Sequence, residues 1–236
     1  MESRRVGNLL RYTGAIIEGH FVGTSGKHLS SYIRKDKAIR FTSIASEFCF
    51  EIAKRFIFAN VDVVVAPAVG GVVLSTWTAH HLTQFCPGRP EILALYSERD
   101  ETAIPYANSI LGVKGNREVI IRHPRFVLNR GFDEDVRGKR ILVVEDILTT
   151  GNSARLTVDA VRQAEGTVVG LGVLANCGNV TAEMCDVNRL EALTAVDRQI
   201  FTEKECAQFG LCAQGVPINT DFGHGKAFLA RGKGQK

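Results

Sequence analysis

The segment Ile141-Leu-Val-Val-Glu-Asp-Ile-Leu-Thr-Thr-Gly-Asn-Ser153 decides the fold of this chain. Its first four residues are apolar and partly β-branched, which predicts a short buried strand and not a helix. Two adjacent carboxylates, Glu145 and Asp146, follow this strand, and a small, hydroxyl-rich turn comes next. Apolar residues at helical spacing then predict a helix over 154–164. The order of strand, polar loop and helix is typical of an α/β domain.

The polar loop has the chemistry of a phosphate site. In an open parallel sheet, ligands bind outside the carboxyl ends of the strands, where a helix N-terminus presents backbone N–H groups to an anion. We therefore expect a phosphate at Thr149, Thr150, Gly151, Asn152 and Ser153. The glycine allows close backbone approach, and the hydroxyl groups donate hydrogen bonds without adding charge. Glu145 and Asp146 would repel a phosphate, so they suit a ribose diol or a divalent metal.

This segment resembles the phosphoribosyl pyrophosphate (PRPP) binding motif of type I phosphoribosyltransferases. That motif consists of apolar residues, two acids, two apolar residues and a Thr-Thr-Gly-type loop, and 141–153 matches every position. It contains neither the glycine pattern of a Walker P-loop nor that of a dinucleotide fingerprint. The alternative is an ordinary strand and helix with an accidental acid pair, but paired acids at a buried strand end need a partner. The resemblance implies catalytic roles for Glu145 and Asp146 beside the ribose.

A second strand, loop and helix precede the first. Residues 61–66 predict a buried strand and residues 72–85 a helix, with Pro67-Ala-Val-Gly-Gly71 between them. The backbone N–H groups of Val69, Gly70 and Gly71 could hold a second anion. In the resembled family, the loop at this place binds the pyrophosphate of PRPP. Taken alone, the two glycines could serve only a tight turn.

Cations for the leaving pyrophosphate are expected after a third predicted strand, 91–97. The resemblance places Arg99 where family members have a Lys-bearing segment, which keeps the charge but changes its geometry. Residues 102–125 have no strong period and correspond to the mobile active-site loop of the family. Lys114, between two glycines, is the expected catalytic cation of this loop. Arg117, Arg122 and Arg125 compete for that role.

The N-terminal segment is expected to build part of a base pocket. Residues 6–18 predict a helix, and residues 19–33 predict a hairpin with a Ser-Gly turn. The hairpin resembles the N-terminal segment of orotate phosphoribosyltransferases, which implies base contacts for Phe21, Lys27 and Tyr32. The alternative is a surface hairpin whose Lys27 is merely solvated.

Two more residues are implied in base binding, Thr149 of the phosphate loop and Cys177 after a predicted strand over 167–175. Orotate enzymes use an Arg near this strand end to hold the orotate carboxylate. Cys177 stands at the aligned position and cannot provide that charge. This departure leaves the identity of the base open.

The remaining segments complete a single predicted α/β domain. A core helix over 40–59 and a last strand over 190–196 join the elements above. We expect a mostly parallel, twisted sheet with helices on both faces. The expected parts are a hood at about 1–40, a core at about 41–200 and a tail at about 201–236.

Composition excludes several classes of protein. Lys and Arg total 29 against 25 Asp and Glu, a net charge of +4 that is too small to argue for nucleic acid. No apolar run reaches the roughly 18 residues of a membrane span, so we expect a cytoplasmic protein. Six scattered cysteines indicate free thiols. Cys206 and Cys212 are too far apart for a Cys-x-x-Cys knuckle, and a zinc site that combines them with Cys185 or His224 is the alternative.

The resemblance extends over nearly the whole chain and implies an enzyme. It would transfer the ribosyl 5-phosphate of PRPP to orotate and release pyrophosphate, with Mg²⁺ bound mainly through PRPP and a homodimer as the assembly. A phosphoribosyltransferase for another purine or pyrimidine base is the second possibility. The third is a regulator that binds PRPP or a nucleotide without turnover, which an attached helix-turn-helix would favour.

Overall fold

The computed structural model describes residues 2–23, 25–100 and 125–231. The chain divides into two compact units. Residues 1–45 and 194–236 form one, here called the terminal unit, and residues 46–193 form the other, the central unit. The residues of the expected hood (about 1–40) and tail (about 201–236) lie in the terminal unit, which also includes 41–45 and 194–200 of the expected core. Among the described residues, no helix has both the length and the apolar character needed to cross a membrane.

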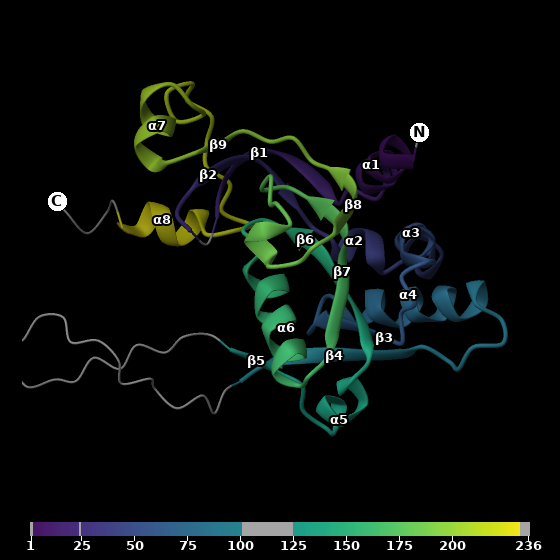
Figure 1. Ribbon diagram of the computed structural model, residues 1–236. Coiled ribbons are helices and arrows are strands. Elements are labelled where there is room, and N and C mark those ends of the chain that lie inside the picture. Colours follow the sequence, from purple (N-terminus) through teal and green to yellow (C-terminus); the bar gives the residue numbers. More distant parts are fainter. Residues whose placement is uncertain (1, 24, 101–124, 232–236) are drawn as a thin grey trace, which may run out of the picture. The chain divides into compact units, whose positions relative to one another are not determined.

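The central unit is built on a six-stranded sheet (Figure 1). Its strand order is β5 (Phe126–Val127), β4 (Leu93–Arg99), β3 (Val63–Pro67), β6 (Arg140–Leu148), β7 (Thr167–Asn176) and β8 (Leu190–Ala195). Strand β3 pairs in parallel with β4 and β6, and β6 pairs in parallel with β7. The short β5 pairs with β4 in the antiparallel direction. The predicted mostly parallel sheet is confirmed.

Helices cover both faces of this sheet because side chains alternate along each strand. Ile141 and Val143 of β6 share an apolar cluster with residues of α6 (Asn152–Gln163), α5 (Phe132–Val136) and η1 (Glu183–Cys185). On the other face, a Cβ atom at Gly172 would lie 2.6 Å from Ile52 of α3 (Thr42–Phe56). Helix α4 (Val72–Phe85) lies on the same side as α3 in Figure 1.

The chain reverses its direction of travel across the sheet between β3 and β6. From β3 the chain passes through α4 to β4 on one side, and from β6 it passes through α6 to β7 on the other. Such a point is where an open α/β sheet binds its ligands, outside the carboxyl ends of the strands. The topology therefore places the candidate site after β3 and β6.

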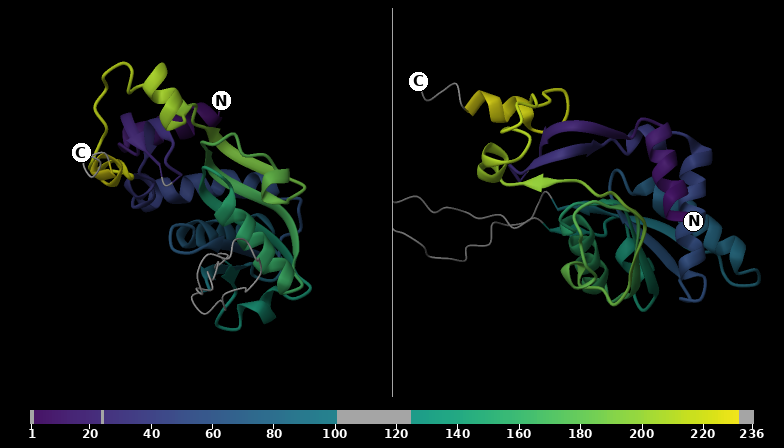
Figure 2. Two further views of the ribbon diagram at one scale, coloured as in Figure 1. Left: turned by 90° about the vertical axis from the view of Figure 1, so that its left-hand side faces the viewer. Right: turned by 90° about the horizontal axis from the view of Figure 1, so that it is seen from above.

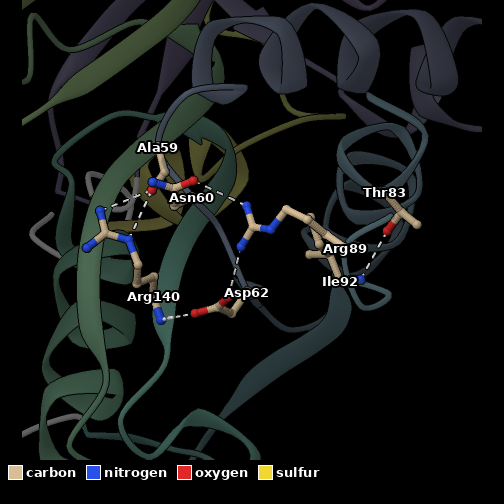
Figure 3. A network of polar contacts seen from close by, with 7 residues as sticks. All are labelled: Ala59, Asn60, Asp62, Thr83, Arg89, Ile92 and Arg140. Carbon is tan, nitrogen blue, oxygen red and sulfur yellow. Dashed lines mark hydrogen bonds and ion pairs between the residues drawn. The ribbon is translucent and has the colours of Figure 1, made fainter. Parts of the chain in front are cut away.

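A polar network holds the opposite edge of the sheet, where the strands begin (Figure 3). The Asp62 carboxylate accepts a hydrogen bond of 2.9 Å from the backbone N–H of Arg140 and forms an ion pair of 3.2 Å with Arg89. The Arg140 guanidinium donates to the Ala59 carbonyl through Nε at 3.1 Å and Nη2 at 3.0 Å. These contacts fix the starts of β3 and β6 against the end of α3.

The terminal unit contains a three-stranded sheet in the order β1 (Ile16–Val22), β2 (His28–Ile33) and β9 (Ile200–Phe201) (Figures 1 and 2). β1 and β2 form an antiparallel pair in which Ile16 faces Ile33, which confirms the predicted hairpin. The helices of this unit are α1 (Glu2–Tyr12), α2 (Asp36–Ile39), α7 (Glu203–Gln208) and α8 (Gly225–Arg231).

The predicted N-terminal helix over 6–18 is wrong in its second half. Helix α1 ends at Tyr12, and Gly14 follows with a φ of +67°, a left-handed conformation that terminates helices. The apolar residues Ile16 and Ile17 therefore belong to β1.

Candidate active site

The two predicted anion loops follow neighbouring strands. Val63 of β3 pairs with Ile141 of β6, and Val65 pairs with Val143. The same register places Pro67, the last residue of β3, at the level of Glu145. Residues 67–71 and 149–153 therefore emerge from adjacent strands at the carboxyl edge of the sheet, as a ligand with two phosphate groups requires.

Glu145 and Asp146 lie within β6 and not after it, so the predicted strand over 141–144 was too short. Strand β6 continues to Leu148 because Ile147 and Leu148 pair with Ala175 and Asn176 of β7. Side chains of successive strand residues point to opposite faces. The two carboxylates therefore diverge, although both residues are buried, with 5% and 3% exposure.

The Glu145 side chain points to the face of the sheet that α6 covers, the same face as Ile141 and Val143. Burial raises the pKa of the Cys185 thiol, and the negative charge of Glu145 raises it further, which places this carboxylate near Cys185. Glu145 Oε1 also accepts a hydrogen bond of 3.0 Å from the Asp146 N–H. This bond restrains the side chain at the end of the strand.

The predicted phosphate loop leads into the N-terminus of α6 as expected. Gly151 is the N-cap residue, with a φ of +77° and no side-chain hydrogen bond that caps the helix. The Thr150 hydroxyl accepts a bond of 3.4 Å from the Asn152 N–H, and Thr149, Thr150 and Asn152 are exposed. A glycine N-cap leaves the N–H groups of Ser153 and Ala154 in the first turn to an external acceptor, which favours an anion at this helix end.

Residues 178–185, which were not predicted to belong to the site, pack against the phosphate loop. A Cβ atom at Gly178 would lie 1.8 Å from the Thr149 carbonyl oxygen, so the two backbones are in close contact. A Cβ atom at Gly151 would lie 2.8 Å from both Val180 and Cys185. Residues 178–185 therefore form the wall against which the phosphate loop is positioned.

Asn176 fixes the conformation of this wall. Its side-chain amide donates to the Val180 carbonyl at 2.8 Å and accepts from the N–H groups of Val180 at 3.1 Å and Gly178 at 3.3 Å. An Asn whose side chain bonds to the backbone two residues ahead is a recognised turn signal. The sequence Asn176-Cys-Gly-Asn could have revealed this turn, but its contact with Thr149 depends on the fold.

The second anion loop retains two of its three predicted N–H groups. The Gly71 N–H donates to the Pro67 carbonyl at 3.1 Å, so it is not directed at a ligand. Gly71 is needed for packing, since a Cβ atom there would lie 2.7 Å from that of Ala66. Val69 is 86% exposed, and neither it nor Gly70 donates a backbone hydrogen bond among the described residues.

Of the cationic side chains predicted to contact the pyrophosphate, Arg99 and Arg125 lie among the residues that the structure describes. Arg99 is exposed at the end of β4, where it pairs with Phe126 of β5. Lys114, Arg117 and Arg122 lie outside the described residues. Arg125 forms an ion pair of 2.9 Å with Asp100, whose N–H donates to the Arg125 carbonyl at 2.9 Å. These two residues join the chain on either side of 101–124.

The residues predicted to bind the base belong to different units. Phe21, Lys27 and Tyr32 lie in the terminal unit, where Phe21 is buried against Tyr32 with ring centroids 5.5 Å apart and Lys27 is exposed. Thr149 and Cys177 lie in the central unit. The Cys177 N–H donates to the Leu148 carbonyl at 2.8 Å, so this residue stands beside the end of β6 and is 4% exposed.

The fold and the loops define a class of protein. Two adjacent loops that are predicted to bind anions, together with two carboxylates, lie at the switch point of a parallel sheet, and this arrangement suits a ribose that carries phosphate groups at two positions. The sequence profile of the family described as "Phosphoribosyl transferase domain" matches residues 40–188.

Sequence relatives identify the group within that class. The chain is 31% identical over 209 residues to a protein of Pelotomaculum thermopropionicum named orotate phosphoribosyltransferase, with 89% of this chain and 91% of that protein covered. The chain belongs to the phosphoribosyltransferase family, and within it to the orotate phosphoribosyltransferases.

Solved structures agree in fold. Orotate phosphoribosyltransferase from Aeropyrum pernix matches with a TM-score of 0.55 at 21% identity and covers 89% of this chain and 98% of its own. The enzyme of Mycobacterium tuberculosis H37Rv in complex with 5-phospho-alpha-D-ribosyl 1-diphosphate (PRPP) matches with a TM-score of 0.50 at 19% identity, over 83% and 95% of the two chains.

Proposed function

We propose that this chain is a pentosyltransferase that converts orotate and PRPP to orotidine 5-phosphate and pyrophosphate. The observation that carries the proposal is the 31% identity to a named orotate phosphoribosyltransferase over most of both chains. The anion loops at the switch point support it, because both phosphorylated ends of PRPP need such a loop.

The reaction forms a bond between a ring nitrogen of orotate and C1 of the ribose. The bond from C1 to pyrophosphate breaks and pyrophosphate leaves with the electron pair, while the ring nitrogen loses its proton to the solvent or to the leaving pyrophosphate. Positive charge develops on the ribose ring in this transition state. We assign Glu145 and Asp146 to the ribose diol, where their negative potential stabilises that charge. Their opposite directions along β6 allow one carboxylate to approach the diol from each side of the strand end.

The two loops hold the ends of the substrate. Thr149, Thr150, Gly151, Asn152 and Ser153 bind the 5-phosphate through hydroxyl groups and the first-turn N–H groups of α6. Val69 and Gly70 donate to the pyrophosphate, and Gly71 shapes their turn. Arg99 is the described cation proposed to stabilise the leaving group, and Lys114 is the proposed cation of the segment that follows.

The chain also offers donors that suit Mg²⁺. Two buried carboxylates beside exposed hydroxyl groups form an oxygen-rich set, which is the donor type that this hard cation prefers. When bound through PRPP, Mg²⁺ supplies positive charge to the pyrophosphate oxygens. We further propose a homodimer located in the cytoplasm, which light scattering of the purified protein and cell fractionation would test.

The identity of the nucleobase decides between the proposed orotate reaction and a second function, transfer to another base. Cys177 stands where the resembled enzymes place an Arg for the orotate carboxylate, so another nucleobase is the alternative substrate. In the orotate reaction, Lys27 or a cation of the 101–124 segment would have to supply that charge.

A base screen tests the proposal directly. Purified protein is incubated with PRPP, Mg²⁺ and one base at a time, with orotate, uracil, adenine, guanine and hypoxanthine compared by pyrophosphate release. We expect release with orotate alone and equal amounts of orotidine 5-phosphate. Turnover of another base in place of orotate would establish the alternative, and PRPP binding without turnover of any base would indicate a regulator.

A further inference from the structure

Two histidines and two cysteines converge in the terminal unit, apart from every residue assigned to PRPP. They are His20 of β1, His28 of β2, Cys206 of α7 and Cys212 in the turn after α7. One nitrogen or sulfur atom from each side chain lies within 4.8 Å of the others. Figure 1 shows α7 and β9 next to the hairpin of β1 and β2, so distant parts of the sequence meet here.

The cluster is buried. His20 is 1% exposed, and His28 and Cys206 are 0% exposed, while Cys212 is partly exposed. The cluster contacts His28 through its Nδ1 atom, and the Nε2 atom, which has no hydrogen-bond partner within the described chain, takes no part in it. Buried polar side chains need partners, and here the side chains from distant parts of the sequence turn their nitrogen and sulfur atoms toward one another.

The distances fit a tetrahedral metal ion. Zinc binds nitrogen at about 2.05 Å and sulfur at about 2.3 Å, so nitrogen and sulfur ligands of one tetrahedral site lie about 3.6 Å apart. His20 Nε2 lies 3.6 Å from Cys206 Sγ and 3.8 Å from Cys212 Sγ, and His28 Nδ1 lies 3.6 Å from Cys212 Sγ. The two imidazole nitrogens, His20 Nε2 and His28 Nδ1, share a hydrogen bond of 2.7 Å, which the metal ion would replace; they would separate by roughly 0.6 Å to reach the tetrahedral spacing.

The surroundings orient these ligand atoms. His20 Nδ1 contacts the Val216 carbonyl at 2.8 Å, which assigns the proton to Nδ1 and leaves the Nε2 lone pair facing the cluster. The Cys212 N–H donates to Cys206 Sγ at 3.3 Å, a contact that stabilises a thiolate. The His28 imidazole packs edge-on against Phe228, with centroids 4.9 Å apart.

The turn after α7 explains how a wide spacing still brings two cysteines together. The Gly210 and Ala213 N–H groups both donate to the Cys206 carbonyl, at 3.1 Å and 3.0 Å, so the chain folds back over Cys206. A Cβ atom at Gly210 would lie 2.8 Å from the Cys206 Cα, which leaves room for glycine alone. The side chains that gather around Cys206 and Cys212 are thus His20 and His28, and not Cys185 or His224, which the sequence offered only as an alternative to free thiols.

We propose that His20, His28, Cys206 and Cys212 bind one structural zinc ion. Two imidazoles and two thiolates are a ligand set that selects zinc, and four protein ligands leave no open position for catalysis. Each thiol gives up a proton on binding, so the two thiolates neutralise the charge of the ion. The ion would connect the hairpin to α7 and its following turn, across 192 positions of sequence from His20 to Cys212.

The test begins with the full-length protein, expressed with zinc in the medium and freed of any histidine tag. Elemental analysis should find about one zinc ion per chain. Removing the metal with a chelator and adding Co²⁺ should give the visible bands of a tetrahedral site and thiolate-to-cobalt charge-transfer bands. Calorimetry of Zn²⁺ binding to the metal-free protein in two buffers should show release of about two protons.

Two cysteine variants provide a matched comparison. Cys212→Ser should lose the zinc and the charge-transfer intensity, whereas Cys86→Ser, a partly exposed thiol of the central unit, should keep both. Thermal unfolding should shift to lower temperature on chelation in the unmodified protein and in Cys86→Ser.

Several results would overturn the proposal. Unmodified protein that contains no zinc and develops no cobalt spectrum does not have this site, whatever the variants show. An intact mass lower by two hydrogens under non-reducing conditions, with that difference absent in Cys212→Ser, would indicate a disulfide that involves Cys212 instead. Equal metal content in Cys212→Ser and unmodified protein would place the ion elsewhere.

Discussion

Gly178→Ala probes the wall behind the phosphate loop. The added Cβ atom would lie 1.8 Å from the Thr149 carbonyl oxygen, whereas an ordinary carbon–oxygen contact is about 3.3 Å. One of the two backbones must therefore move by about 1.5 Å. The obstacle is backbone and not the end of a flexible side chain, so it cannot rotate away.

We expect two separable consequences. A displacement of about 1 Å in a group that positions substrate can lower a rate by about 100-fold, so kcat/KM for PRPP should fall by about that factor. Overpacking costs about 1–3 kcal/mol, which for a chain of this size lowers the unfolding temperature by about 2 to 12 °C. Steady-state kinetics at varied PRPP and thermal unfolding measure the two effects on one preparation.

Gly7→Ala is the matched control. Gly7 lies in α1, and its added Cβ atom would be 3.5 Å from the Arg11 guanidinium, an ordinary contact. Alanine also favours a helix by up to about 1 kcal/mol, so this variant should lose neither activity nor stability. If Gly178→Ala behaves like Gly7→Ala in both assays, the close packing of residues 178 and 149 is refuted.

Three further variants test other parts of the molecule. Asp146→Asn should lower turnover by about 100-fold or more because an amide keeps the shape but not the charge facing the ribosyl cation, and unchanged turnover would remove Asp146 from the mechanism. Cys177→Arg places a cation at a residue that is 4% exposed, so it should lower the unfolding temperature of the protein without ligand. It should also enlarge the rise in unfolding temperature that orotate causes, and an unchanged rise would reject Cys177 as a base contact. Asp62→Ala removes a hydrogen-bonded, partly exposed ion pair at the far edge of the sheet and should cost about 1–2 kcal/mol in urea unfolding, with KM for PRPP unaffected.

Local patterns predicted most of the central unit. Helix α4 begins and ends at the expected residues, 72 and 85, because its apolar face and its flanking glycines are both local signals. Strand β6 was predicted to end before Glu145, since its extension depends on pairing of Ile147 and Leu148 with β7. A strand partner distant in sequence leaves no trace in the local pattern.

The terminal unit was predicted less well. Helix α7 begins with a capping box of Thr202 and Glu205, a signal present in the sequence but not used. The zinc ligands could not be grouped, because His20 and His28 precede Cys206 by more than 170 residues. The wall at residues 178–185 was missed for the same reason: its contact with Thr149 is a property of the tertiary structure.

The discontinuity of the terminal unit has a consequence for synthesis on the ribosome. The central unit is one continuous stretch, so it can fold as soon as residue 193 has emerged. The hairpin of β1 and β2 is made first but waits for β9, since Leu29 pairs with Ile200. A two-stranded hairpin alone is marginally stable in water, and His20 and His28 would remain without their cysteine partners during this interval. The earliest part of the chain to be translated is thus among the last to acquire its native structure.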